Sequence, residues 1–100
     1  MKNVILSADG DSVIYSVPDI VAENLSEYCI NFCNNWLRNS PHAEKYRKQG
    51  YLCYTEEDFI GYLNRYLFPD EKSVFVKNIG LTDSGRNIPE EYSDYPFFNF

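Results

Sequence analysis

The first seventeen residues carry two short apolar runs, and their pattern predicts a β-hairpin. Residues 3–8 and 11–17 are rich in Val, Ile and Tyr, which are common in strands. Asp9-Gly10 lies between the runs and is a strong signal for a two-residue turn with positive φ at both positions. A turn of this kind sets the register of the two strands. The expected cross-strand pairs are Val4–Tyr15 and Leu6–Val13 on the core face, and Ile5–Ile14 on the opposite face.

From about residue 19 to about residue 39 the apolar residues recur every three or four positions, which predicts one long amphipathic helix. Ser16 and Asp19 have the spacing of a capping box at its start. Ile30 and Leu37 widen the apolar stripe, so we expect the helix to be buried on more than one side. The stripe itself consists of Val21, Leu25, Tyr28, Cys29, Phe32, Cys33 and Trp36.

Two further helical segments are expected in the middle of the chain. Ser40-Pro41 has the residue types of a helix N-cap and first turn, which predicts a short helical turn over residues 42–49. Thr55 and Asp58 form a second capping-box pattern. The apolar residues that follow keep helical spacing as far as about residue 68, so a second main helix is expected there.

The remaining chain predicts one more strand and an extended tail. Residues 73–79 have the composition of a strand, and residues 80–100 carry Gly and Pro with little periodicity. The order is therefore ββααβ, with the short helical turn between the two main helices. We expect one α+β domain over residues 1–100, with its helices packed on one face of a small antiparallel or mixed sheet.

Charge narrows the classes of partner. Fifteen acidic against nine basic residues give a net charge of −6, whereas binding to duplex nucleic acid needs a basic surface. We therefore expect no direct nucleic-acid contact, and a protein partner with a basic surface instead. Three cysteines cannot form a closed disulfide framework, and no apolar stretch reaches the length of a signal-peptide core or a membrane span. A cytoplasmic protein without a membrane segment is the expectation.

Candidate chemistry is sparse. Cys29, Cys33, His42 and Cys53 are the residues that could form a zinc set, but their spacing fits no common knuckle. Cys29 and Cys33 also lie in the apolar stripe, where buried thiols are common. Asp9-Gly10-Asp11 is better interpreted as a turn than as a cation loop, and no phosphate loop or nucleophile elbow is present. We expect no catalytic, metal or cofactor site.

Aromatic residues next to carboxylates suggest where a partner would dock. One group lies in the connection before the second main helix and the other in the C-terminal tail. The tail aromatics have two interpretations, since they either fold back to close the core or remain available for recognition. The predicted partner-binding residues are Tyr51, Tyr54, Glu56 and Glu57 in the connection, and Glu90, Glu91, Tyr92, Asp94 and Tyr95 in the tail.

These observations favour a non-enzymatic protein-binding module, in the form of a small bacterial immunity-type or inhibitor-type protein that neutralises a basic partner. The first alternative is a small-ligand binder or an enzyme that uses His42 and Cys53 with Tyr51 and Tyr54. The second alternative is a homo-oligomeric protein that associates through its strand edges or its tail. Sequence leaves open whether the chain is a monomer or a homodimer.

Overall fold

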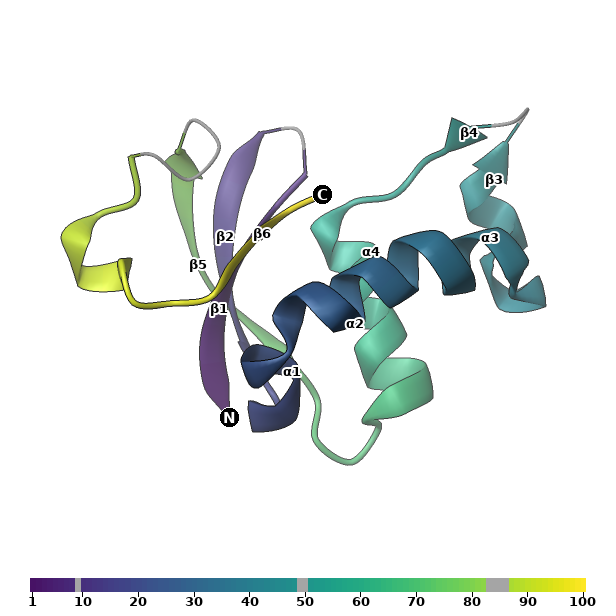
Figure 1. The fold of residues 1–100 in the computed structure, drawn as a ribbon, viewed down its shortest axis with the longest axis horizontal. Helices are drawn as coiled ribbons and strands as arrows, with labels where there is room; N and C mark the ends of the chain where they lie inside the picture. The colour runs from purple at the N-terminus through teal and green to yellow at the C-terminus, as the bar shows by residue number, and fades with distance from the viewer. Residues whose placement is uncertain (9, 49–50, 83–86) are drawn as a thin grey trace.

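A four-stranded mixed sheet with helices packed on one of its faces forms the framework of the protein (Figure 1). The computed structural model describes residues 1–8, 10–48, 51–82 and 87–100. Strand order across the sheet is β5-β2-β1-β6. The α+β class, the N-terminal hairpin and the placement of the helices on one face of the sheet confirm the predicted fold.

The hairpin consists of β1 (Lys2–Ser7) and β2 (Asp11–Val17). Its register is the predicted one, because Val4 lies opposite Tyr15 and Ile5 lies opposite Ile14. The predicted turn includes Asp9, which lies outside the described residues. The buried face that packs on the helices carries Val4, Leu6, Val13, Tyr15 and Val17, as expected from their alternation along the strands.

Two more strands flank the hairpin. β5 (Val74–Leu81) pairs antiparallel with β2 and confirms the strand expected over residues 73–79. β6 (Phe97–Asn99) pairs parallel with β1 and was not predicted. It is held at both ends by backbone hydrogen bonds, from the Ile5 N–H to the Pro96 carbonyl at 2.8 Å and from the Phe100 N–H to the Ser7 carbonyl at 2.8 Å. A three-residue strand has no periodicity of its own, so only its partner reveals it.

The first main helix has the predicted span but is not continuous. The chain leaves helical geometry at Asn24, where φ is −133° and ψ is 39°. A π-helical turn then replaces the α-helix over five residues. The successive segments are α1 (Asp19–Glu23), α2 (Leu25–Asn31), the π-helical η1 (Phe32–Trp36) and α3 (Leu37–Asn39).

The capping box predicted from Ser16 and Asp19 is wrong. Ser16 belongs to β2 and pairs with both Asn3 and a residue of β5, so the strand continues to within two residues of the helix. Pro18 is the N-cap, and no side chain caps the helix. The carboxylate of Asp19 instead pairs with the N-terminal amine of Met1 at 2.9 Å, which lowers the pKa of this carboxyl group.

The short helical turn is 3₁₀-helical and ends earlier than predicted. η2 (Pro41–Tyr46) begins at Ser40, whose hydroxyl accepts the His42 N–H at 3.2 Å as expected for an N-cap. Beyond it the chain forms a two-residue hairpin of β3 (Arg47–Lys48) and β4 (Tyr51–Leu52) instead of continuing as a helix. At the start of this hairpin the Arg47 guanidinium donates hydrogen bonds to the carbonyls of Leu37 and Ser40, at the end of the preceding helix.

The second main helix consists of α4 (Glu56–Tyr62) and the π-helical η3 (Leu63–Leu67). Its predicted capping box is confirmed, since the Asp58 carboxylate accepts the Thr55 N–H at 2.8 Å. In the described part of the chain, no helix combines the length and apolar character that a bilayer crossing requires.

Aromatic rings fill the space between the helices and the sheet. Phe32 is fully buried at the centre, with five rings around it at centroid distances of 5.2–6.2 Å. Phe98 and Phe100 pack against this core, so these two tail aromatics close it. The rings around Phe32 are Trp36, Tyr54, Phe59, Tyr62 and Phe100.

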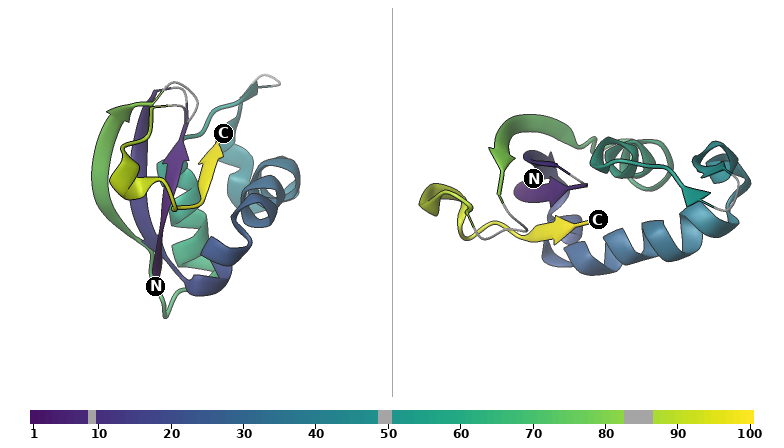
Figure 2. Two further views of the ribbon diagram at one scale, coloured as in Figure 1. Left: turned by 60° about the vertical axis from the view of Figure 1, so that its left-hand side comes forward. Right: turned by 90° about the horizontal axis from the view of Figure 1, so that it is seen from above.

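The second face of the sheet is covered by the tail. Ile5 and Ile14 are buried there, although the helices lie on the other side. The segment that contains η4 (Glu90–Tyr92) runs along this second side before it turns into β6 (Figure 2). The ammonium group of Lys77, opposite Ile14, donates to the Tyr92 hydroxyl at 3.3 Å and ties the tail to the sheet.

Candidate functional site

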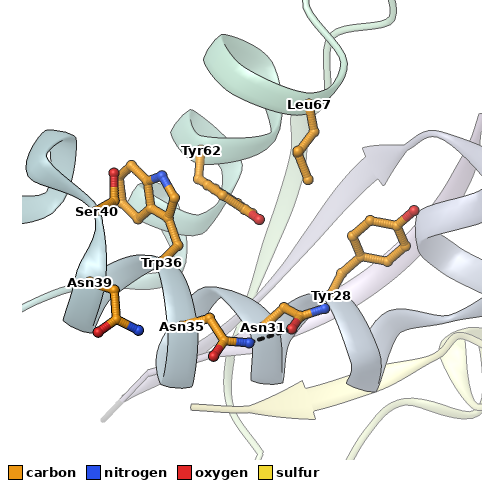
Figure 3. A pocket seen from close by; sticks show the side chains of 8 residues that line it. All are labelled: Tyr28, Asn31, Asn35, Trp36, Asn39, Ser40, Tyr62 and Leu67. Carbon is orange, nitrogen blue, oxygen red and sulfur yellow. Dashed lines mark hydrogen bonds between the residues drawn. The ribbon is translucent and has the colours of Figure 1, made fainter.

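A groove of about 570 Å³ runs between the first main helix, over α2, η1 and α3, and the second main helix (Figure 3). None of the side chains that line it is charged, although a quarter of the chain's residues are. Its walls carry three amides, three aromatic rings, one serine and one leucine. We call this feature the neutral groove, and its volume lies in the range of sites for small molecules and short peptides.

Three asparagines form one rim of the neutral groove. Asn31 ends α2, Asn35 lies in η1 and Asn39 ends α3, and all three line the groove. The Asn35 Nδ2 donates to the Asn31 Oδ1 at 2.7 Å, which aligns the first two amides. Asparagine costs a helix roughly 0.7 kcal/mol relative to alanine at each position. Three such exposed residues lower the helix's own stability, and the fold gains no buried contact from them.

Both helices that form the walls contain a π-helical turn beside the neutral groove. Trp36 ends η1 on one wall, and Leu67 ends η3 on the other. π-Helical turns are rare in proteins and often mark functional sites. Their occurrence in both walls distinguishes this groove from an ordinary gap between helices.

The floor of the groove is aromatic and uncharged at neutral pH. The Trp36 and Tyr62 rings are 5.0 Å apart, and Tyr28 lies at the other end of the groove. Burial raises the pKa of Tyr62, with a smaller contribution from Tyr28, so its hydroxyl stays protonated. The floor can therefore donate and accept hydrogen bonds without carrying charge.

A smaller polar hollow of about 200 Å³ lies on the other side of the Trp36–Tyr62 pair. His42 lines it, with its ring 5.1 Å from that of Tyr66. Cys53 is exposed and does not line the hollow, so the structure does not bring the sequence-predicted pair of His42 and Cys53 into one cavity. The charged side chains around His42 are Lys45, Glu57, Asp58 and Arg65.

An acidic groove lies between α1–α2 and residues 94–97. Two adjoining hollows of about 420 and 500 Å³ form it, and they share Glu23. Glu27 and Asp94 add two more carboxylates, whereas Lys2 is the one base along the lining. The Lys2 ammonium is 4.0 Å from the Glu23 carboxylate. The acidic groove therefore keeps a negative balance.

Only part of the predicted partner-binding set in the tail meets at one place. Asp94 and Tyr95 line the acidic groove. Glu90 and Glu91 are exposed on η4, on the far side of the sheet from the helices. Tyr92 is half-buried and lies between the Lys77 ammonium and the Tyr95 ring. Two of the five predicted tail residues therefore line the acidic groove.

The residues predicted in the connection lie elsewhere. Tyr54 is half-buried in the aromatic core, and its hydroxyl lies 3.3 Å from the Cys33 sulfur. Glu56 and Glu57 form the first turn of α4, where Glu57 lines the polar hollow. Tyr51 belongs to β4, and its side chain lies outside the described part of the structure. Of the predicted connection residues whose side chains the structure describes, none lines the acidic groove.

The thiols occupy three different environments. Cys29 is fully buried in the core, Cys33 is half-buried against it, and Cys53 is exposed. Burial raises the pKa of both the Cys29 and the Cys33 thiols. Within the described ranges, no group of three or more His, Cys, Asp or Glu side chains is arranged to hold a metal ion.

Sequence reasoning predicted Asp94 and Tyr95 but missed the residues on the first main helix that line the two grooves. Glu23, Glu27 and the three asparagines fall on the polar side of the helical pattern, where solvation explains them equally well. The asparagine repeat at intervals of four is a signal that could have been noticed. No protein-family model matches the sequence, and searches of curated proteins and of solved structures also found no match.

Proposed function

We propose that this chain is a protein-binding module, rather than an enzyme, and that it docks a partner with a basic surface through the acidic groove. The observation that carries the proposal is that Glu23 from the helices and Asp94 from the tail line one hollow of the groove, and that Glu23 and Glu27 line the adjoining hollow. Asp94 is far from the two glutamates in the sequence, so this groove forms only in the folded chain. Opposite charge on a partner would steer association and fix its orientation.

Two of these carboxylates, those of Glu27 and Asp94, are available to form ion pairs with a partner. Glu27 and Asp94 form no ion pair with any residue that the structure describes. A basic side chain docked beside either carboxylate would form an ion pair there without displacing an existing one. Such a contact contributes more at an interface than on an open surface, because the groove walls exclude part of the water.

Apolar side chains on the elements that form the acidic groove would add apolar contact area to an interface with a partner. Ile20 in α1 and Ile30 in α2 are about half exposed on the same two helices that carry Glu23 and Glu27. Tyr95 adds an aromatic ring at the groove. Interfaces combine a few apolar or aromatic anchors with a polar rim, and this surface has both.

We propose specifically that the protein acts in a bacterial cell as an immunity-type or inhibitor-type protein. Its partner would be a basic toxin or nuclease. Small size, a net charge of −6 and a groove open to a partner support it. Three free thiols, one of them exposed, suit the reducing cytoplasm in which such a protein would act.

The test compares two variants with equal charge change. The groove variant carries Glu23→Gln, Glu27→Gln and Asp94→Asn, and the control carries Glu44→Gln, Asp70→Asn and Glu71→Gln at exposed positions elsewhere. Immobilised wild-type chain is used to recover a partner from the source organism, and the dissociation constant of the purified pair is then measured by calorimetry. We expect a basic partner whose binding weakens about 10-fold or more in the groove variant, and less than about 3-fold in the control.

An acidic or neutral partner would contradict the proposal. Equal weakening by the two variants would also contradict it, because the effect would then come from net charge alone. Wild-type binding should weaken as salt rises from 50 to 300 mM, since the interaction is electrostatic.

The polar hollow supports a second candidate, a small-ligand binder centred on His42. Gly61 lies on the hollow, and a methyl group added there would meet no atom within 4 Å. Gly61→Ala would therefore place a methyl group at the hollow without a clash. Loss of binding of a small charged metabolite in this variant, with an unchanged partner affinity, would favour this candidate over the first.

A further inference from the structure

We infer that the outer edge of β5 pairs with the same edge of a second copy of this chain, antiparallel and about a two-fold axis at Asn78. β5 is the last strand of the sheet on its side, and no strand that the structure describes pairs with its outer edge (Figure 2). An edge strand presents a row of unpaired N–H and C=O groups, which an incoming strand can pair in register. The occupant that this edge fits is therefore another extended strand.

The apolar side chains of β5 are unusually exposed. Phe75 is 61% exposed and Leu81 is 77% exposed, and Val74 and Val76 are about half exposed. Lys77 is the one charged residue of the strand, in a chain whose net charge is −6. Two copies can therefore approach along β5 without bringing acidic residues of this strand together.

The pairing of β5 with β2 places its two most exposed side chains on one face of the sheet. Phe75 lies opposite Tyr15 and Leu81 lies opposite Asp11, with Asn78 midway between them. Tyr15 and Asp11 are four residues apart in a strand, so they point to the same side, and directly opposite residues share a face. The rings of Phe75 and Tyr15 are 6.1 Å apart, in agreement with this placement.

This arrangement makes the strand complementary to itself. In an antiparallel pair centred on Asn78, Phe75 of each copy lies opposite Leu81 of the partner subunit, so both copies of the apolar pair form together. The pairing with β2 has one register shift on either side of Asn78, so the irregular part of each strand lies across from that of the other and the two strands keep step. A pair centred on Lys77 instead would place two ammonium groups opposite each other, which is unfavourable.

The polar side chains near the axis are engaged within their own copy. The Asn78 Nδ2 donates to the Asp11 carboxylate at 3.0 Å, and the Asn78 Oδ1 accepts the Gly80 N–H at 2.7 Å. The Lys77 ammonium lies 3.3 Å from the Tyr92 hydroxyl of the tail. Main-chain groups and apolar side chains are therefore what the outer edge of β5 offers to a second copy.

The inference goes beyond the proposed function, because no residue of β5 lines the acidic groove. A basic partner and a second copy would occupy different surfaces. A strand of a different protein would also fit an open edge. Self-pairing is favoured because the exposed apolar positions of β5 match the same positions in reversed order.

Disulfide cross-linking tests the register. Phe75→Cys and Leu81→Cys are introduced separately into a Cys53→Ser background, which lacks the exposed native thiol. Mixed and oxidised with copper phenanthroline, the two variants should form a linked heterodimer, because directly opposite Cβ atoms lie about 5 Å apart. Each variant alone should yield at least about 5-fold less linked dimer, since its two thiols would be about 13 Å apart, the length of four strand residues. Intact mass spectrometry identifies each product.

Sedimentation equilibrium measures the association without cross-linking. The mass of the unmodified chain should rise from 11.7 kDa towards twice that value as its concentration approaches about 1 mM. Leu81→Ala should raise the dissociation constant of the dimer about 5-fold or more, because the two-fold axis repeats the lost contact. Ile20→Ala, at a half-exposed position of α1, is the matched control and should change this constant less than about 2-fold.

Three results would overturn the inference. Cross-linking of either single variant as fast as the mixture would show a contact without this register. A mass that stays at one chain up to about 1 mM, with no linked heterodimer, would leave the edge to a strand of another protein. Equal dissociation constants for Leu81→Ala and the wild type would place the contact elsewhere. Variants of the acidic groove should leave the dimer intact, which separates failure of this inference from failure of the proposed function.

Discussion

The indole ring of Trp36 lies 5.0 Å from the phenol ring of Tyr62, and this pair forms a wall between two hollows. Both rings line the neutral groove on one side and the polar hollow on the other. Trp36 also stacks on the buried ring of Phe32 at 5.7 Å. A change at this pair therefore affects the core and both hollows together.

Trp36→Ala should lower the free energy of unfolding by about 2–4 kcal/mol, because it removes a large, half-buried ring and leaves a cavity beside Phe32. Trp36→Phe keeps an aromatic ring in place and should cost about 1 kcal/mol. Urea denaturation followed by far-ultraviolet circular dichroism measures both. A loss below 1 kcal/mol for the alanine variant would show that the ring contributes little to the core.

Phe100→Ala should destabilise the fold by about 2–4 kcal/mol. Its ring contacts the rings of Phe32, Tyr54, Phe59 and Phe98, although it is the last residue of the sequence. Asn99→Ala is the control, because this neighbouring side chain is exposed and should change stability by less than about 0.5 kcal/mol. Equal stability of the two variants would mean that the tail aromatics do not close the core.

Substitutions at Asn64 and at Ser73 should have opposite effects on the free energy of unfolding. The Asn64 carboxamide donates to the Ser73 carbonyl at 3.0 Å and accepts the Ser73 N–H at 2.7 Å. Asn64→Ala should therefore cost about 1–3 kcal/mol, because it leaves two backbone groups of a buried residue unpaired. The Ser73 hydroxyl is buried without a hydrogen-bond partner in the described structure, so Ser73→Ala should leave stability equal or raise it by up to about 1 kcal/mol. Thermal melts of both variants measure the contrast.

Stability should fall in alkaline solution. Burial raises the pKa of Cys29 above its ordinary 9.0, and burial with the carboxylates of Glu56 and Glu57 raises the pKa of Tyr15 to about 12. Since the unfolded chain loses these protons first, the stabilisation is complete below about pH 8, and it is lost as pH rises above 9.0 for Cys29 and from 10.0 to about 12 for Tyr15. Cys29 alone should cost roughly 2 kcal/mol at pH 10.5.

Urea denaturation at pH 7.5 and 10.5, with a reductant present, measures this effect. Cys29→Ala should be less stable at both pH values but should show a drop smaller by roughly 2 kcal/mol. A pH dependence that is unchanged in this variant would assign the alkaline loss to other groups.

The open edge of β5 should promote self-association at high concentration. No described strand pairs with its outer edge, and Phe75 and Leu81 are 61% and 77% exposed. Long apolar edge strands pair readily with other chains, and this supports the homo-oligomer alternative. Light scattering should show a rise in mass at millimolar concentration that Val76→Lys removes and Ile20→Lys, at an equally exposed helical position, does not. The same mass for wild type and Val76→Lys would exclude the edge as the contact.

Local signals predicted the fold where neighbouring residues decide the structure. The Asp9-Gly10 dipeptide and the alternation around it were sufficient for the hairpin register, and the Thr55–Asp58 capping box formed as expected. Ser16 and Asp19 show where the same reasoning fails. Their spacing is that of a capping box, but Ser16 pairs across the sheet as part of β2. The Asp19 carboxylate forms an ion pair with the N-terminal amine instead.

The sequence by itself determined the hairpin, the two helical spans and the α+β class, because periodicity and turn chemistry act over a few residues. Only the tertiary structure decided the rest. β6, the aromatic core around Phe32, and the acidic groove lined by Glu23, Glu27 and Asp94 depend on contacts between segments that lie up to about ninety residues apart in the sequence. The neutral groove also exists only between two packed helices, so the three asparagines line a candidate site only when the opposite wall is in place.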